Sequence, residues 1–329
     1  MIPCDPTPWL MVQNGLPAVR ARRMLGLHRE DDAAFVLKQE KTLAAEQDAD
    51  GSFGSSPLRT AGTLNLLDDL RATASAETIA RGARYLFSVL QAQPGYERAR
   101  DIQPGTLTTP CDLCGFFGPY EARGEPERMA HGADEMNALR AYEPLTGPQS
   151  PVRGERRSSR DRAGPSSCYA WGLIPLSYIV EALCRAGYGH DARLQPAINA
   201  LLGAQRESGG WCRNLGGHTG CSIHAIRALS AHPALRSTTY AQRALRFWRE
   251  TQLGERGADL ARWWRGTNLF AALQAANAFD LPLAREIQRD ALAALVPRQR
   301  KNGTFGTPHP VERVAAVLLA IKRCAPAGH

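Results

Sequence analysis

Cysteine and histidine side chains at the spacing of metal ligands are the clearest sign of chemistry in this sequence. Cys111 and Cys114 form a C-x2-C pair followed by glycine, a spacing that lets two thiolates bind one ion. A second pair, Cys212 and Cys221, lies in a glycine-rich stretch that also contains His218. Tetrahedral ligation by sulfur and nitrogen suits zinc. We therefore predict a Zn2+ site formed by the four cysteines, with His218 as a substitute ligand.

The number of protein ligands decides what such a zinc ion does. Four thiolates complete the coordination shell and make the site structural, and the composition of the two pairs favours this interpretation. Three protein ligands would leave a position open to activate water or a substrate thiol, and Cys168 is a further substitute ligand. Two alternatives stay open: an iron–sulfur cluster on the same thiolates, and cysteines that are only small buried hydrophobic residues.

An acid–base pair is the second candidate chemistry. His131, Asp134 and Glu135 are spaced i, i+3 and i+4, so they share one face of a predicted helix. An imidazole and a carboxylate that project together into a cavity can donate and accept protons, which makes these three residues the catalytic candidates. The alternative is a partly solvated helix whose charges only face water.

Two further groups of residues are candidates for substrate binding. Arg153, Arg156 and Arg157 belong to an arginine-rich run, and a guanidinium presents a planar fork to phosphate or carboxylate. Trp264 and Asn268 are four residues apart, and a tryptophan that lines a cavity would suit a long apolar or cation-forming ligand. The alternatives are a solvated surface loop for the arginines and ordinary core packing for Trp264.

A repeated turn organises the elements that must position these residues. It occurs most clearly at Gln47 to Gly54, Gln205 to Trp211 and Gln299 to Gly306. In each copy a glycine follows the glutamine by four residues, and an aromatic residue follows that glycine by two. The glycine permits a left-handed turn where a helix ends, the aromatic ring packs between neighbouring units, and the glutamine amide can bond helix termini.

Helices of two kinds alternate around these turns, as judged by 3.6-residue periodicity. The amphipathic, charge-bearing outer helices are predicted at 30–46, 77–92, 191–205, 237–252 and 283–298. The inner helices, which are poorer in charge, are predicted at 57–72, 129–143, 169–186, 221–232, 262–279 and 308–323. The pattern predicts one all-α domain over 1–329, a closed two-layer ring with an N-terminal extension (1–28) and an irregular arginine-rich loop (144–167).

The three turns resemble the Q-x3-G-x-W/F motif of the prenyltransferase and squalene-cyclase repeat superfamily, whose members are α/α toroids, and the repeats span about residues 30–323. The resemblance implies a toroid of about five or six helix pairs. In such a toroid the segments that lead into the inner helices emerge at one end, so the two cysteine pairs would meet at one mouth. It also implies a terpene cyclase or prenyltransferase-like enzyme that encloses an apolar, isoprenoid-derived molecule with an anionic head.

A second resemblance is local. The segment from Ser166 to Leu176 is similar to the Asp-x-Cys-Tyr segment of protein farnesyltransferase-type β subunits, in which the Asp and Cys bind catalytic zinc. Here Ser166 stands at the Asp position, so only Cys168 is carried over. The chain has neither the D-x-D-D motif of class II cyclases nor the D-D-x-x-D motif of class I terpene synthases, which disfavours both chemistries.

Composition limits the class of protein and its partners. The chain has 329 residues, a net charge of +8 and 43% hydrophobic residues, as expected for a globular protein. No apolar run reaches the length of a membrane span and the N-terminus lacks a signal-peptide pattern, so we expect a cytoplasmic location. A small hydrophobic or anionic substrate is the expected partner, and nucleic acid is not. The competing interpretation is a non-catalytic, zinc-stapled module that binds a protein or an anion.

Overall fold

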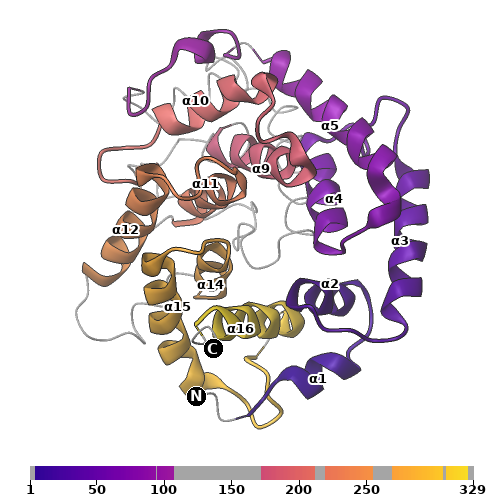
Figure 1. The fold of residues 1–329 in the computed structure, drawn as a ribbon. Coiled ribbons are helices and arrows are strands. Elements are labelled where there is room, and N and C mark those ends of the chain that lie inside the picture. Colours follow the sequence, from indigo (N-terminus) through magenta and orange to yellow (C-terminus); the bar gives the residue numbers. More distant parts are fainter. Residues whose placement is uncertain are drawn as a thin grey trace, which may run out of the picture.

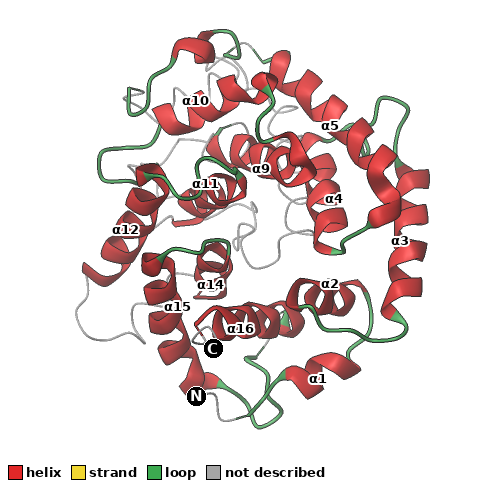
Figure 2. Cartoon of the chain, viewed as in Figure 1, coloured by secondary structure: helices red, strands yellow, loops and turns green. Residues whose placement is uncertain are grey.

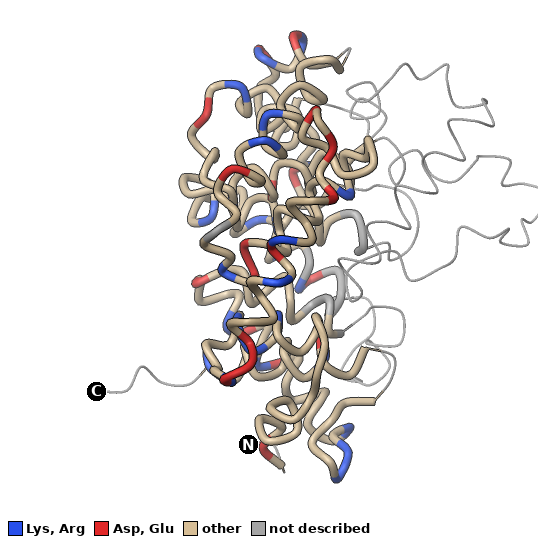
Figure 3. Tube along the Cα trace, turned by 90° about the vertical axis from the view of Figure 1, so that its right-hand side faces the viewer, with Lys and Arg blue, Asp and Glu red and all other residues tan. Residues whose placement is uncertain are grey.

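The computed structural model describes residues 4–93, 95–106, 172–211, 219–254, 269–306 and 309–324. In these ranges the chain is helical, and it contains no strand apart from an isolated bridge between Phe53 and Ser56 (Figure 2). The prediction of an all-α protein is therefore confirmed. No described helix is long and apolar enough to cross a membrane. Basic and acidic residues are interspersed along the described part of the chain rather than gathered on one face (Figure 3).

The helices lie in two layers around a common centre (Figure 1). The inner helices are α2 (Leu16–Leu25), α4 (Pro57–Asp69), α9 (Leu173–Leu183), α11 (Thr219–Ala231), α14 (Leu269–Asn277) and α16 (Pro310–Cys324). Those outside them are α1 (Thr7–Val12), α3 (Asp32–Glu46), α5 (Ala76–Gln91), α10 (Gln195–Gly203), α12 (Thr239–Gly254) and α15 (Pro282–Leu295). Each inner helix contacts the next, and α16 contacts α2, so these contacts form a closed circuit.

Short helical turns connect several of these elements. The 3-10 turns are η1 (Thr73–Ser75), η2 (Arg98–Asp101), η5 (Ala192–Leu194) and η6 (Val296–Arg298), and the π-helical turn η4 (Cys184–Tyr188) extends α9. Every residue of α9 is buried, which explains why its sequence is almost continuously apolar. The outer helices α5, α12 and α15 are amphipathic: each has one apolar face and one charged face, because only one face packs on the inner layer.

Each predicted helix that falls within the described residues overlaps a helix of the structure, and the structure adds α1 and α2 within residues 1–28. The prediction treated residues 1–28 as an extension, but α2 lies in the inner layer between α16 and α4. Its row of arginines hid an apolar face made by Ala18, Val19, Ala21 and Leu25. The helix predicted at 262–279 is described only from Leu269. The predicted helix at 129–143 and the loop at 144–167 lie outside the described residues.

The three repeated turns share one set of hydrogen bonds. Gln205 donates from its side-chain amide to the carbonyl of Gly209 (3.0 Å) and to that of Tyr240 (2.9 Å), which lies in the first turn of α12. In the first turn, Gln47 donates in the same way to Gly51 and to Thr78 at the beginning of α5. The predicted bonding of helix termini by the glutamine amide is confirmed, and the structure adds that each glutamine joins its own turn to the outer helix of the next unit.

The third turn makes the same bonds to the N-terminal segment and so closes the circuit. Gln299 donates to the carbonyls of Gly303 (3.2 Å) and Cys4 (2.6 Å), and its side-chain oxygen accepts from the Cys4 amide (3.1 Å). The segment that enters α1 therefore takes the place of the next outer helix. The aromatic residues of the turns, Phe53, Trp211 and Phe305, are buried.

Candidate functional site

Nearly all the residues predicted to do chemistry lie outside the residues that the structure describes. They are Cys111, Cys114, Cys168, Cys212, His218, His131, Asp134, Glu135, Arg153, Arg156, Arg157, Trp264 and Asn268. Cys221 is the exception, because it lies in the first turn of α11. The described segments contain no group of three or more His, Cys, Asp or Glu side chains able to hold a metal ion. The zinc site, the acid–base pair and the substrate-binding residues therefore stay predictions.

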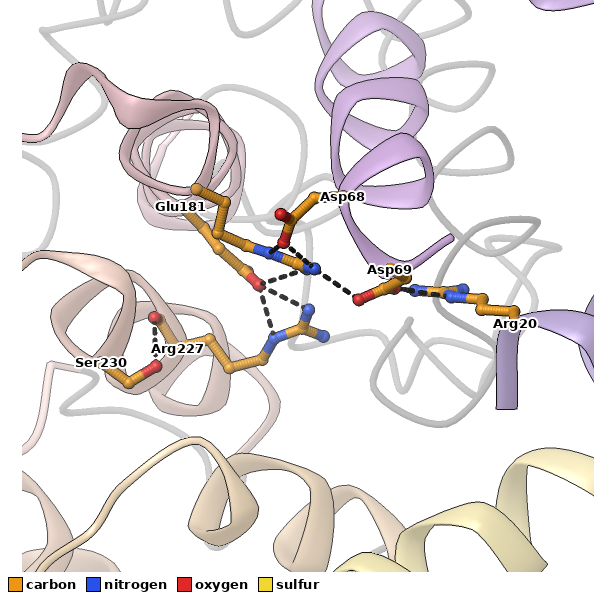
Figure 4. Close-up of polar contacts among 7 residues, drawn as sticks. Arg20, Asp68, Asp69, Glu181, Arg227 and Ser230 are labelled. Carbon is orange, nitrogen blue, oxygen red and sulfur yellow. Dashed lines mark hydrogen bonds and ion pairs between the residues drawn. The ribbon is translucent and has the colours of Figure 1, made fainter. Parts of the chain in front are cut away.

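A cluster of charged residues joins five elements of the inner layer (Figure 4). We call it the charged cluster; it consists of Arg20 on α2, Asp68 and Asp69 on α4, Glu181 on α9, Arg185 on η4 and Arg227 on α11. Arg20 donates from Nε to Asp69 (2.7 Å), and Arg185 pairs with Asp69 and with Asp68 (2.6 Å). Arg227 donates to Glu181 from Nη2 (2.6 Å) and Nε (3.2 Å).

The charges of this cluster balance. Three guanidinium groups face three carboxylates, so the sum is zero. Burial opposes the charged form of Arg185, but the fields of Asp69, Asp68 and Glu181 outweigh it and raise the pKa of Arg185 above its ordinary value. Arg227 and Glu181 expose only 6% and 5% of their side chains, so each would be costly to bury alone. The charged cluster is thus a paired layer that links α2, α4, α9 and α11.

Polar side chains lie one turn before the charged cluster on three of the same helices. Asn65 precedes Asp69 by four residues, and Ser177 precedes Glu181 by four, so each lies one turn nearer the N-terminus of its helix. On α11, His224 precedes Arg227 by three residues. The ring of His224 meets that of Tyr178 edge-on, with centroids 6.1 Å apart. We call Asn65, Ser177, Tyr178 and His224 the polar cluster.

Two members of the polar cluster have unused hydrogen-bonding atoms. Asn65 and Ser177 are fully buried, and the side-chain nitrogen and oxygen of Asn65 and the hydroxyl of Ser177 have no hydrogen-bond partner in the described structure. A buried polar group without a partner costs about 1–3 kcal/mol. Native cores rarely retain such groups unless they serve a function or bind another molecule. These atoms could orient a hydroxyl, carbonyl or amide group, and His224 with Tyr178 could exchange a proton with it.

Sequence reasoning missed both clusters. None of their residues was among the candidate site residues predicted from the sequence. A usable signal was present, because polar residues recur three or four positions apart along the charge-poor inner helices. No protein-family model matches this chain, and no curated protein matches it either.

Proposed function

We propose that the chain is an α/α toroid that encloses a largely apolar, isoprenoid-derived small molecule with an anionic head, and that it acts on this molecule as a cyclase or transferase. The observation that carries the proposal is the polar cluster. Asn65 and Ser177 are completely buried on α4 and α9, two helices of the closed circuit, yet within the described residues nothing satisfies their hydrogen-bonding atoms. An enclosed ligand that bears a neutral polar group would satisfy them.

The charged cluster supports a direction of entry for this ligand. Asp68 and Asp69 end α4, and Arg185 follows α9, so the charged cluster lies toward the C-terminal ends of these helices. Its ion pairs join neighbouring inner helices. The polar cluster lies one turn further toward the helix N-termini, and the predicted ligands Cys168 and Cys212 precede the N-termini of α9 and α11 in the sequence. We infer that the ligand enters from that end.

Zinc belongs to the same proposal. Of the four predicted cysteine ligands, Cys221 is at the beginning of α11, one turn before His224, and this position supports a metal site near the N-terminal end of α11. Elemental analysis of the purified protein tests this point. We expect one zinc per chain, lost on Cys111→Ser and on Cys212→Ser but kept on Cys168→Ser. A metal-free wild type would contradict the zinc assignment.

If the polar cluster binds a ligand, it should not stabilise the ligand-free protein. Replacing Asn65 with leucine, a residue of similar size, removes two buried polar atoms that lack partners. We therefore expect the free energy of unfolding of the ligand-free protein to stay the same or to rise by about 1–3 kcal/mol, as measured by urea denaturation.

Asn277→Leu is the matched control. Asn277 is also buried, but its side-chain nitrogen donates to the carbonyl of Ala316 (2.9 Å) and its oxygen accepts from Gln288 (3.1 Å). This substitution should destabilise the protein, by about 1–3 kcal/mol, because it leaves those partners unpaired. An equal loss of stability in Asn65→Leu would mean that Asn65 has a structural role, and the proposal would lose its main support.

A further inference from the structure

Two arginines meet at the third repeated turn without an acidic partner. Arg300 follows Gln299, and Arg313 lies in the first turn of α16. A Cβ atom added to Gly306 would lie 3.5 Å from Nη2 of Arg300 and 3.5 Å from Nη1 of Arg313, so these nitrogens are at most about 7 Å apart, twice 3.5 Å. In the ranges that the structure describes, neither arginine forms an ion pair, and Glu312 next to Arg313 supplies none.

Arg313 has an unusual setting for a charged group. Its guanidinium carbon lies 4.8 Å from the centre of the Phe270 ring, and its Nη1 donates to the carbonyl of Phe305 (3.2 Å). Its Nε is buried and has no hydrogen-bond partner in the described residues. Burial, and the charge of Arg300, lower the pKa of Arg313. A positive charge in this position is unfavourable by itself, and a bound anion would stabilise it.

The first repeated turn shows what this position looks like when the chain supplies its own acids. There Gln47 is flanked by Glu46 and Asp48. Glu46 lies 3.9 Å from Arg59, and Asp48 accepts a hydrogen bond from the amide of Gly54 (2.7 Å). A Cβ on Gly54 would lie 3.2 Å from Nη1 of Arg59, so Arg59 approaches this turn as Arg313 approaches the third.

The third turn replaces these two acids with bases. Gln299 is flanked by Arg298 and Arg300, whereas Gln47 is flanked by Glu46 and Asp48. The backbone hydrogen bonds of the turn are nevertheless the same, with Gly303 bonded to the carbonyl of Arg300 as Gly51 is to that of Asp48. The first turn therefore carries acids that balance its arginine. The third turn has the same backbone hydrogen bonds but carries a second positive charge instead.

We propose that Arg300 and Arg313 form a binding site for an oxyanion, the phosphate or carboxylate head of the enclosed molecule. In this identification of the ligand, the inference rests on the proposed function. Guanidinium groups bind both oxyanions through paired hydrogen bonds, and two of them at this separation can hold one anion between them. Gly306, at φ +87°, keeps the gap between them open, because any side chain there would fill it. The neighbours of Arg313 on its other side are the buried residues Phe270 and Phe305.

Calorimetric titration of the full-length protein with inorganic phosphate, and separately with acetate, tests the site. We expect saturable binding at low ionic strength, weakened at least tenfold by Arg313→Gln and by Arg300→Gln. The Arg300 side chain is exposed, so its variant keeps the test valid if Arg313→Gln fails to fold. Tighter binding of phosphate would identify a phosphoryl head, and tighter binding of acetate a carboxylate.

Arg59→Gln is the matched control, since Arg59 occupies the equivalent position beside its own acids, and it should leave anion binding unchanged. Absence of anion binding in the wild type, or equal affinities in all variants, would overturn the site. Asn65→Leu separates this inference from the proposed function: it should not change phosphate binding, even if no apolar ligand binds to the ring.

Discussion

Glu181→Gln is expected to lower the free energy of unfolding by about 3–5 kcal/mol, because it removes the carboxylate of a buried ion pair. The guanidinium of Arg227 bonds Oε1 of Glu181 through two nitrogens, at 2.6 and 3.2 Å, and both side chains are almost fully buried. Arg185, 3.8 Å from the same oxygen, would also lose a neighbouring negative charge. Urea denaturation followed by circular dichroism measures the loss.

An exposed pair serves as the control for this prediction. Glu77 and Arg84 are 3.3 Å apart, but they expose 78% and 62% of their side chains, so Glu77→Gln should cost less than about 1 kcal/mol. The double variant Glu181→Leu with Arg227→Met should recover most of the lost stability, because it removes both charges of the pair together. If Glu181→Gln were no more harmful than Glu77→Gln, the charged cluster would not link the inner helices.

Gly209→Ala is expected to lower the free energy of unfolding by about 2–5 kcal/mol. Gly209 has φ +95°, and a left-handed backbone costs a residue other than glycine about 1–2 kcal/mol. In addition, a Cβ at this position would overlap the backbone carbonyl of Arg243 in α12, and relieving such an overlap typically costs about 1–3 kcal/mol. The turn and α12 would have to separate, which would also weaken the hydrogen bonds of Gln205. Thermal and urea unfolding both measure the effect.

Gly187→Ala separates the two contributions. Gly187 has nearly the same backbone angle, φ +93°, but an added Cβ would meet no atom within 4 Å. Gly187→Ala should therefore lower the free energy of unfolding by about 1–2 kcal/mol, the cost of the left-handed backbone alone. Equal losses in the two variants would show that the repeated turn does not press against the next outer helix, and our account of how the units are joined would be wrong.

The repeated turns could be predicted because their causes are local. A glycine at positive φ, a glutamine four residues earlier and a buried aromatic residue are all visible within eight residues of sequence, and the structure confirms the role of each. The helix α2 could not be found in this way. It was predicted as part of an N-terminal extension, whereas Arg22 is buried against Asp32 and carbonyl groups of the N-terminal segment.

The candidate site was harder to predict than the fold because it depends on which helix faces meet. Asn65 and Ser177 are ordinary polar residues in the sequence, and only the packing of α4, α9 and α11 shows that they are buried without partners. Asp69 pairs with Arg20, 49 positions away, and with Arg185, 116 positions away. Arg300 and Arg313 are 13 positions apart in the sequence, and only the folded third turn shows that their guanidinium groups meet beside Gly306.

The most direct test of the proposed function is an equilibrium titration of the protein with farnesol, an apolar isoprenoid whose hydroxyl is a neutral polar group, followed by tryptophan fluorescence, in the wild type and in Asn65→Leu. We predict saturable binding of one molecule per chain in the wild type, and affinity at least about tenfold lower in the variant, the loss of about one good hydrogen bond. Failure of the probe to bind the wild type, or equal affinity for both proteins, would contradict the proposal that the ring encloses such a molecule against the polar cluster.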